Sequence, residues 1–331
     1  MLNRVPLFFT FFLLLVACSS NDEVFYYTEI SDNYIIHCPE PPIEIMSSTD
    51  EESIIRGEKL LNYFNIIQIS KNLYYMYYEA YTVPVATYEG NIKFAYSNDG
   101  IHWTKNFPND DKTDNIIISK GVAGISVVQI SDNDYPFRMF GYGKYESGAG
   151  IYMWKSKDGI SFSDRHFVIE GLFDTQQVAV YREGMIKLYT RLWEDKDHNR
   201  KIGVVYIDRN GNVIKGPYPL RDNFVYNSAA SYLDVNYDLL FPTFFRDTGE
   251  NVDNAYIKAM IVSEYNSKEI KCNIGEWIGN KEPWMLVSPG IIDLNGKKYI
   301  SYYTRSWSHM SEMPNDGISR YKLIEIQIEK K

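Results

Sequence analysis

The chain has 331 residues, of which 45% are hydrophobic and 15% aromatic, and its formal net charge is −9 at pH 7. A chain of this length and composition can bury a large core. An acidic protein without a basic run argues against a nucleic acid as partner.

The N-terminus reads as an export signal. Residues 1–17, MLNRVPLFFTFFLLLVA, combine Arg4 with an apolar run and small residues. This pattern is typical of a secretory signal and is too short to span a bilayer. The tetrapeptide LVAC at 15–18 resembles a bacterial lipoprotein box, in which Cys18 becomes the lipidated first residue. SSNDE at 19–23 resembles the acidic tag that sends some lipoproteins to the outer face of the outer membrane, so we expect a lipid-anchored outer-membrane protein, facing the periplasm or the cell surface.

Residues 18–46 are expected to form a lipidated tether and a lead-in. The stretch CPEPPIEIM at 38–46 holds three prolines, which exclude a central strand. Cys38 and Cys272 would lie in an oxidising compartment, where they either pair or remain buried thiols.

From about residue 60 one pattern occurs five times: a strand, and then a hairpin. The five hairpins are LYYMYYEAY with NIKFAYSNDGIHW, PFRMFGYG with IYMWKSKDGISF, MIKLYTRLW with KIGVVYIDRNGN, YDLLFPTFF with AYIKAMIVSEYNSKE, and KKYISYYTRSW with SRYKLIEIQIEK. The strands before them are NYFNIIQIS, GISVVQIS, TQQVAVY, NSAASYLDV and SPGIIDL.

These short runs alternate apolar and polar residues between Gly, Asn and Asp turns, which predicts an all-β protein. The turn residues Asp99 and Asp158 are expected to bond the amides of their own turns. Each unit is too small to bury its own faces, so the units must cover one another. We predict a five-bladed β-propeller in one domain, residues 47–331, with a segment within 24–46 supplying the missing outer strand of the last unit.

Charges recur at the ends of three second strands. Glu79, Arg191 and Arg305 each follow an aromatic residue by two positions, and strand alternation puts each charge on the side of its aromatic neighbours, including Trp193 and Trp307. Such charges are costly in a sheet unless they are paired or line a polar pocket. Two interpretations stay open: an ion cluster that ties blades together, or the floor of a sugar site.

Further polar residues are expected at the same end of the predicted propeller. Asp174 heads the third inner strand, Tyr226 enters the fourth unit, and His309 lies just past the last second strand. Asp174 is either a turn residue or the best-placed carboxylate of the chain. No His or Cys cluster indicates a metal and no cofactor is expected, although a calcium ion in the central channel stays open.

The hairpins SNDGIHW and SKDGISF, with DNII, FDTQQVAVY, LYTR, YNSAASY and the terminal YYTRSWSHMSEMPNDGISRYKL, resemble five-bladed propeller glycoside hydrolases of the family 43, 32 and 130 kind. The resemblance covers residues 60–331 and is closest to bacterial family 32- or 43-like lipoproteins. It implies glycoside cleavage by carboxylates in a central pocket. Asp174 corresponds to the middle acid of these families. The first inner strand carries no acid at its start, no Glu opens the fourth blade, and Glu79 has no clean counterpart.

We therefore expect an exo-acting glycoside hydrolase, in which Glu79 is the proton donor and Asp174 the base or nucleophile, kept ionised by Arg191. Asp247 or Glu194 could also take either role. The expected substrate-binding residues are Arg191, Arg305, Trp193, Trp307, Gln177, Tyr226 and His309.

Two other classes remain. One is a non-catalytic glycan-binding lipoprotein on the cell surface, and the other is a structural propeller that docks proteins. For the enzyme, the expected partners are an oligo- or polysaccharide and, through Cys18, a membrane, and the expected state is a monomer.

Overall fold

The structure, a computed structural model, describes residues 34–82, 90–108, 114–171, 177–194, 200–220, 225–234, 236–245, 255–264, 266–277, 284–306 and 317–331. No helix within these ranges has the length and apolar character needed to cross a bilayer.

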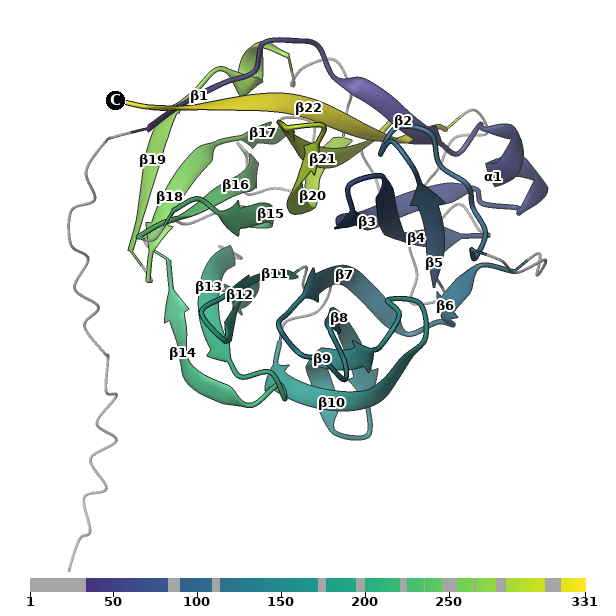
Figure 1. The fold of residues 1–331 in the computed structure, drawn as a ribbon, viewed down its shortest axis with the longest axis horizontal. Coiled ribbons are helices and arrows are strands. Elements are labelled where there is room, and N and C mark those ends of the chain that lie inside the picture. Colours follow the sequence, from purple (N-terminus) through teal and green to yellow (C-terminus); the bar gives the residue numbers. More distant parts are fainter. Residues whose placement is uncertain are drawn as a thin grey trace, which may run out of the picture.

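The strands form three four-stranded antiparallel sheets and one larger sheet that holds two further blades. The five units, called blades 1 to 5, are arranged around a central axis (Figure 1). Blade 1 contains β3 (Leu60–Ser70), β4 (Leu73–Tyr81), β5 (Asn91–Ser97) and β6 (Ile116–Ile118). Blade 2 contains β7 (Val122–Gln129), β8 (Phe137–Tyr145), β9 (Gly148–Ser156) and β10 (Phe162–Glu170). Blade 3 contains β11 (Gln177–Arg182), β12 (Met185–Glu194), β13 (Arg200–Ile207) and β14 (Val213–Pro219).

Blades 4 and 5 complete the circle. Blade 4 contains β15 (Val225–Tyr232), β16 (Asp238–Phe245), β17 (Ala255–Ile257), β18 (Ala259–Ser263) and β19 (Asn266–Cys272). Blade 5 contains β20 (Trp284–Leu294), β21 (Lys297–Arg305), β22 (Ser319–Lys330) and, at its outer edge, β2 (Ile43–Ser47). The inner strands β3, β7, β11, β15 and β20 contact one another in a closed ring. The predicted five-bladed propeller is confirmed.

The N-terminal segment closes the ring. β2 pairs antiparallel with β22, where Ile43 faces Leu323 and Ser47 faces Arg320. The sequence predicted a closing strand within 24–46, and β2 extends one residue beyond that range. A second strand, β1 (Tyr34–His37), pairs parallel with β19 and antiparallel with the end of β22, and so joins blades 4 and 5. The short helices α1 (Glu51–Ile55) and η1 (Ile274–Glu276) lie in connections.

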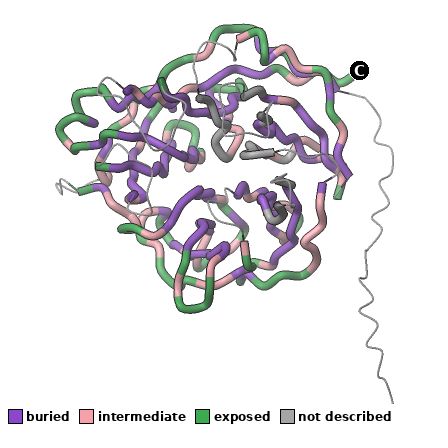
Figure 2. Tube along the Cα trace, turned by 180° about the vertical axis from the view of Figure 1, so that it is seen from behind, coloured by how far each residue is buried: buried purple, intermediate pink, exposed green. Residues whose placement is uncertain are grey.

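The core is divided among the gaps between blades. Five apolar clusters of described residues each fill the gap between one pair of neighbouring blades. Between blades 1 and 2, for example, Tyr77 and Phe94 meet Val127 and Met139. Because most strands are covered on both faces, their sequences read as nearly continuous apolar runs rather than as strict alternation. Figure 2 shows buried residues along these strands and exposed residues at the outer turns.

The turn chemistry follows the sequence. The Oδ1 atoms of Asp99 and Asp158 accept hydrogen bonds from the amides two and three residues further on, at 2.7 to 2.8 Å. The next residues, Gly100 and Gly159, have φ of 77° and 76°, a conformation that favours glycine. The structural role predicted for both aspartates is confirmed.

Four of the inner strands contain a register shift, which in β3, β7 and β15 lies near the start of the strand. It lies between Leu61 and Phe64 in β3, Ala123 and Ser126 in β7, Val225 and Ser228 in β15, and Val287 and Ile291 in β20. A bulge of this kind bends a strand and redirects the side chains within it. In blade 1 it contains Asn62, whose side chain turns toward Glu79.

Candidate functional site

The predicted charges lie at one end of the ring. Antiparallel pairing places the end of each second strand beside the start of its inner strand. The pairs are Leu60 with Tyr81, Gln177 with Thr190, and Trp284 with Arg305. Since the inner strands form a closed ring, Glu79, Arg191 and Arg305 come to the same end of the propeller from blades 1, 3 and 5.

Glu79 is held in one orientation by its own blade. Its side chain is buried, and Asn62 Nδ2 donates to Oε2 at 3.0 Å while the Tyr81 hydroxyl donates to Oε1 at 2.5 Å. The Tyr81 ring in turn covers Gly90, because a Cβ at that glycine would lie 2.6 Å from Cζ of the ring. Glu79 is therefore a carboxyl group fixed through both oxygens at this end of the ring.

Arg305 is fully buried, with 0% of its surface exposed. Its guanidinium carbon lies 5.7 Å from the centre of the Tyr303 ring, on the same side of β21, as strand alternation predicted. The Tyr303 ring packs edge-on against Tyr63 of β3, with the ring centres 5.5 Å apart. Arg305 therefore faces the boundary between blades 5 and 1.

Arg191 and Gln177 occupy the same level in blade 3, and both are buried. The Gln177 amide nitrogen donates to the main-chain oxygen of Gly124 in blade 2, so this side chain links two blades. A register shift between Arg191 and Trp193 breaks simple alternation there. The side chain of Trp193 is not described, so a shared face for these two residues stays a prediction.

For the other predicted site residues, either the residue or its side chain is not described. Cys18, Asp174, Asp247, Trp307 and His309 belong to undescribed stretches. Trp193, Glu194 and Tyr226 lie in described strands, but their side chains are not described. The roles assigned to all of them remain predictions.

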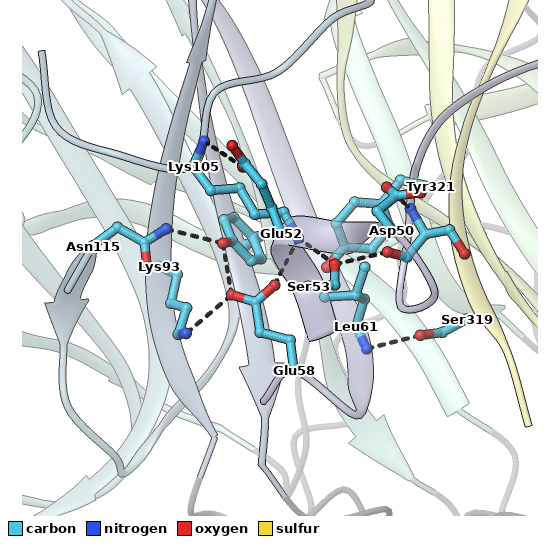
Figure 3. Close-up of polar contacts among 12 residues, drawn as sticks. Asp50, Glu52, Ser53, Glu58, Leu61, Lys93, Lys105, Asn115, Ser319 and Tyr321 are labelled. Atoms are coloured by element: carbon cyan, nitrogen blue, oxygen red, sulfur yellow. Dashed lines mark hydrogen bonds and ion pairs between the residues drawn. The ribbon is translucent and has the colours of Figure 1, made fainter. Parts of the chain in front are cut away.

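Sequence analysis missed a buried ion cluster in blade 1 (Figure 3). Glu58 precedes β3, and its carboxylate binds Lys93 Nζ at 2.9 Å and Lys105 Nζ at 2.7 Å. The Tyr78 hydroxyl donates to the same carboxylate at 2.9 Å and accepts from Asn115 Nδ2 at 2.9 Å. Lys105 also contacts Ser53 of α1, so the cluster fastens this helix to the blade.

Opposing effects set the ionisation of this cluster. Burial alone would raise the pKa of Glu58, but Lys105 and Lys93 outweigh it and hold that pKa below its ordinary value. Burial lowers the pKa of Lys105, and the attraction of Glu58 counters that shift only in part. The signal in the sequence is Lys93 inside the apolar strand NIKFAYS, but its partner lies 35 positions away.

A second missed cluster joins blades 3 and 4. Asp238 Oδ2 accepts hydrogen bonds from Lys187 Nζ and from the Tyr189 hydroxyl, both at 2.6 Å. Burial, followed by the nearby Asp238 charge, raises the pKa of Tyr189 well above its ordinary value. The neutral phenol therefore stays a donor. Both clusters connect residues of the blades to one another, and we assign them structural roles. Among the described residues, the second oxygen of Asp238, Oδ1, has no hydrogen-bond partner.

Within the described residues, no three His, Cys, Asp or Glu side chains come together as metal ligands would. The site, as far as it is described, offers one oriented carboxylate and two buried guanidinium groups. Such groups can bind hydroxyl or carboxylate groups of a ligand through charge-assisted hydrogen bonds.

No protein-family model matches the sequence, and a search of curated proteins finds no match. Solved structures with a similar fold include an α-L-arabinofuranosidase from Podospora anserina in complex with cellotriose. The two are 9% identical with a TM-score of 0.54, over 89% of this chain and 96% of that chain. A GH32 β-fructofuranosidase from Bombyx mori is 11% identical with a TM-score of 0.53, over 81% of this chain and 60% of that chain. At such identities the likeness shows that this chain shares the propeller fold of glycoside hydrolases.

Proposed function

We propose that the protein is an exo-acting glycoside hydrolase whose substrate enters at the end of the propeller that carries Glu79, Arg191 and Arg305. The observation that carries the proposal is the Glu79 carboxyl, buried and oriented by Asn62 and Tyr81 at the end of a five-bladed ring. Structures of this fold include an arabinofuranosidase solved with cellotriose and a mutant β-fructofuranosidase solved with sucrose.

Cleavage of a glycosidic bond needs a proton donor at the leaving oxygen and a second carboxylate as nucleophile or base. In this proposal Glu79 is the donor and Asp174 the second carboxylate. Because a phenol both donates and accepts, the Tyr81 hydroxyl can keep its bond to Glu79 in either protonation state. Arg191 and Arg305 would donate to sugar oxygens, and Trp193, Trp307, Tyr226 and His309 would complete the pocket.

The test is hydrolysis of a panel of plant and host glycans by the exported protein, followed by separate variants at the two carboxyls. Glu79→Gln and Asp174→Asn should each lower kcat/KM by about 100-fold or more, because each removes one partner of the acid–base pair. Glu146→Gln, whose side chain is 87% exposed, and Asp134→Asn, an exposed turn residue, are the matched controls. If both site variants fold with unchanged Tm and keep parental activity, the assignment is wrong.

A specific feature favours a second candidate, a non-catalytic glycan-binding lipoprotein. The start of β3, LLNY, carries no carboxyl group at the mouth of blade 1. This candidate predicts saturable binding to a glycan of the same panel, without release of sugar. Loss of that binding in Arg305→Gln, with no hydrolysis by the parent, would favour it.

We also propose that the mature protein is anchored to the outer membrane through a lipid on Cys18. This proposal rests on the sequence of residues 1–23.

A further inference from the structure

Cys38 and Cys272 lie far apart in the sequence and meet between blades 4 and 5. Cys38 follows β1, and Cys272 is the last residue of β19. The parallel pairing of these strands places Ile36 opposite Cys272. Because Cys38 is two residues beyond Ile36, its side chain leaves β1 on the same side. Both cysteines belong to one apolar cluster between blades 4 and 5.

Hydrogen bonds hold Cys38 beside the end of β19. Its amide donates to Asn273 Oδ1 at 2.7 Å, and its carbonyl oxygen accepts from Trp277 Nε1 at 2.7 Å. These partners fix the main chain of Cys38 next to the residue that follows Cys272. The position of Cys38 is thus set by Asn273 and Trp277, the residues on either side of η1.

The two thiols also interact with each other. A side-chain hydrogen bond between them raises the pKa of Cys38 and lowers the pKa of Cys272. Cys38 is only 2% exposed, whereas Cys272 is partly exposed. Cys272 is therefore the thiol that ionises first and can be reached from solvent.

We propose that Cys38 and Cys272 form a disulfide that locks the ring closed, with a small-molecule or protein disulfide as the oxidant. Both cysteines are free thiols in this structure. β1 bridges blades 4 and 5 through main-chain hydrogen bonds and apolar packing, and the disulfide makes that seam covalent. The loop that it closes contains blades 1 to 4, so it restricts most of the unfolded chain.

The reaction proceeds by two exchanges. The Cys272 thiolate attacks one sulfur of the oxidant, whose disulfide bond breaks and releases its other sulfur as a thiolate. The Cys38 thiol loses its proton to that thiolate and attacks Sγ of Cys272, which breaks the mixed disulfide and releases the second half of the oxidant. The two cysteines give up two electrons and two protons, and the oxidant becomes two thiols.

Peptide mapping of the full-length chain tests the proposal directly. The chain is equilibrated with oxidised glutathione, alkylated without reduction and digested. The expected result is a linked pair of peptides that contain Cys38 and Cys272, which separates on reduction. Recovery of both cysteines in alkylated form, or of Cys38 linked to Cys18, would overturn the proposal.

Stability gives a second measure. The Tm of the oxidised parent should exceed that of the reduced parent by roughly 5–10 °C. Cys38→Ala and Cys272→Ala should abolish this difference, whereas Cys18→Ala should keep it. Each comparison is between the oxidised and reduced forms of one variant. A packing loss at Cys38 lowers the Tm of both forms and therefore cancels in the difference. If Cys38→Ala does not fold, the partly exposed Cys272 provides the same comparison, and an unchanged difference in Cys272→Ala would refute the link.

Discussion

At the scale of single residues, two buried carboxylates are surrounded by side chains that donate hydrogen bonds to them. Glu58 has two lysines and a phenol around it, and Asp238 has a lysine and a phenol. Removing two ions from water is costly, and their attraction offsets that cost only when the remaining hydrogen-bonding groups are also satisfied. A change that takes away one partner leaves the others buried and uncompensated.

Glu58→Gln should therefore lower the free energy of unfolding by about 3–5 kcal/mol, because two buried lysines lose their counter-charge. Urea unfolding of the parent and the variant measures the difference. The control is Glu329→Gln, whose partner His37 is half-exposed, and which should change stability by less than about 0.5 kcal/mol. Equal losses in the two variants would show that the cluster has no special role.

The same carboxyl predicts a pH dependence. Burial opposes ionisation of Glu58, but Lys105 and Lys93 hold its folded-state pKa below the ordinary value of 4.5. Its stabilising contribution is therefore complete above about pH 4.5 and is lost as the pH falls through the folded-state pKa. The difference in stability between the parent and Glu58→Gln should accordingly shrink in acid.

At the scale of elements, β2 is an integral part of blade 5. Met46 is 3% exposed and lies opposite Tyr321, in the cluster between blades 5 and 1. Met46→Ala should cost about 2–5 kcal/mol of stability, as expected for a buried methionine. Ile43→Ala is the control in the same strand, since Ile43 is 38% exposed and should cost clearly less. Chemical denaturation of both variants measures these losses in the free energy of unfolding. A loss in Met46→Ala no greater than that in Ile43→Ala would mean that β2 is dispensable.

The strands that the sequence predicted are those whose patterns are strong. Tyrosine-rich runs such as LYYMYYEAY, and runs such as NIKFAYS that end at an Asp-Gly turn, identify the hairpins, because both faces of each strand are covered by neighbours. Outer strands carry weaker patterns. β6 has only three residues, and β14 reads VIKGPYP, in which Gly216 and Pro217 indicate a loop. The bulges of the inner strands have no local signature, since they arise from packing within the ring.

At the scale of the whole molecule, the repeat predicted the blade number, but could not define the site. Glu79 and Arg305 were selected from their register, and in the structure both are buried at one end of the ring. Asn62, which donates to Glu79, and Tyr63, which packs against Tyr303, lie in a bulge that sequence periodicity does not reveal. The site gathers side chains from several blades, so its geometry depends on how the ring closes and not on any one repeat.

The proposed attachment of this ring to a membrane depends on Cys18, and Cys18→Ala tests the proposal. A lipid chain contributes about 0.8 kcal/mol of membrane binding for each buried CH₂ group, so a lipidated Cys18 should keep the parent in the membrane fraction. Cys18→Ala should instead appear in the soluble fraction or retain residues 1–17, which mass spectrometry of the chain distinguishes. Cys272→Ala is the matched control and should remain with the membrane. If Cys18→Ala fractionates with the membrane as the parent does, after removal of residues 1–17, the anchor does not depend on Cys18.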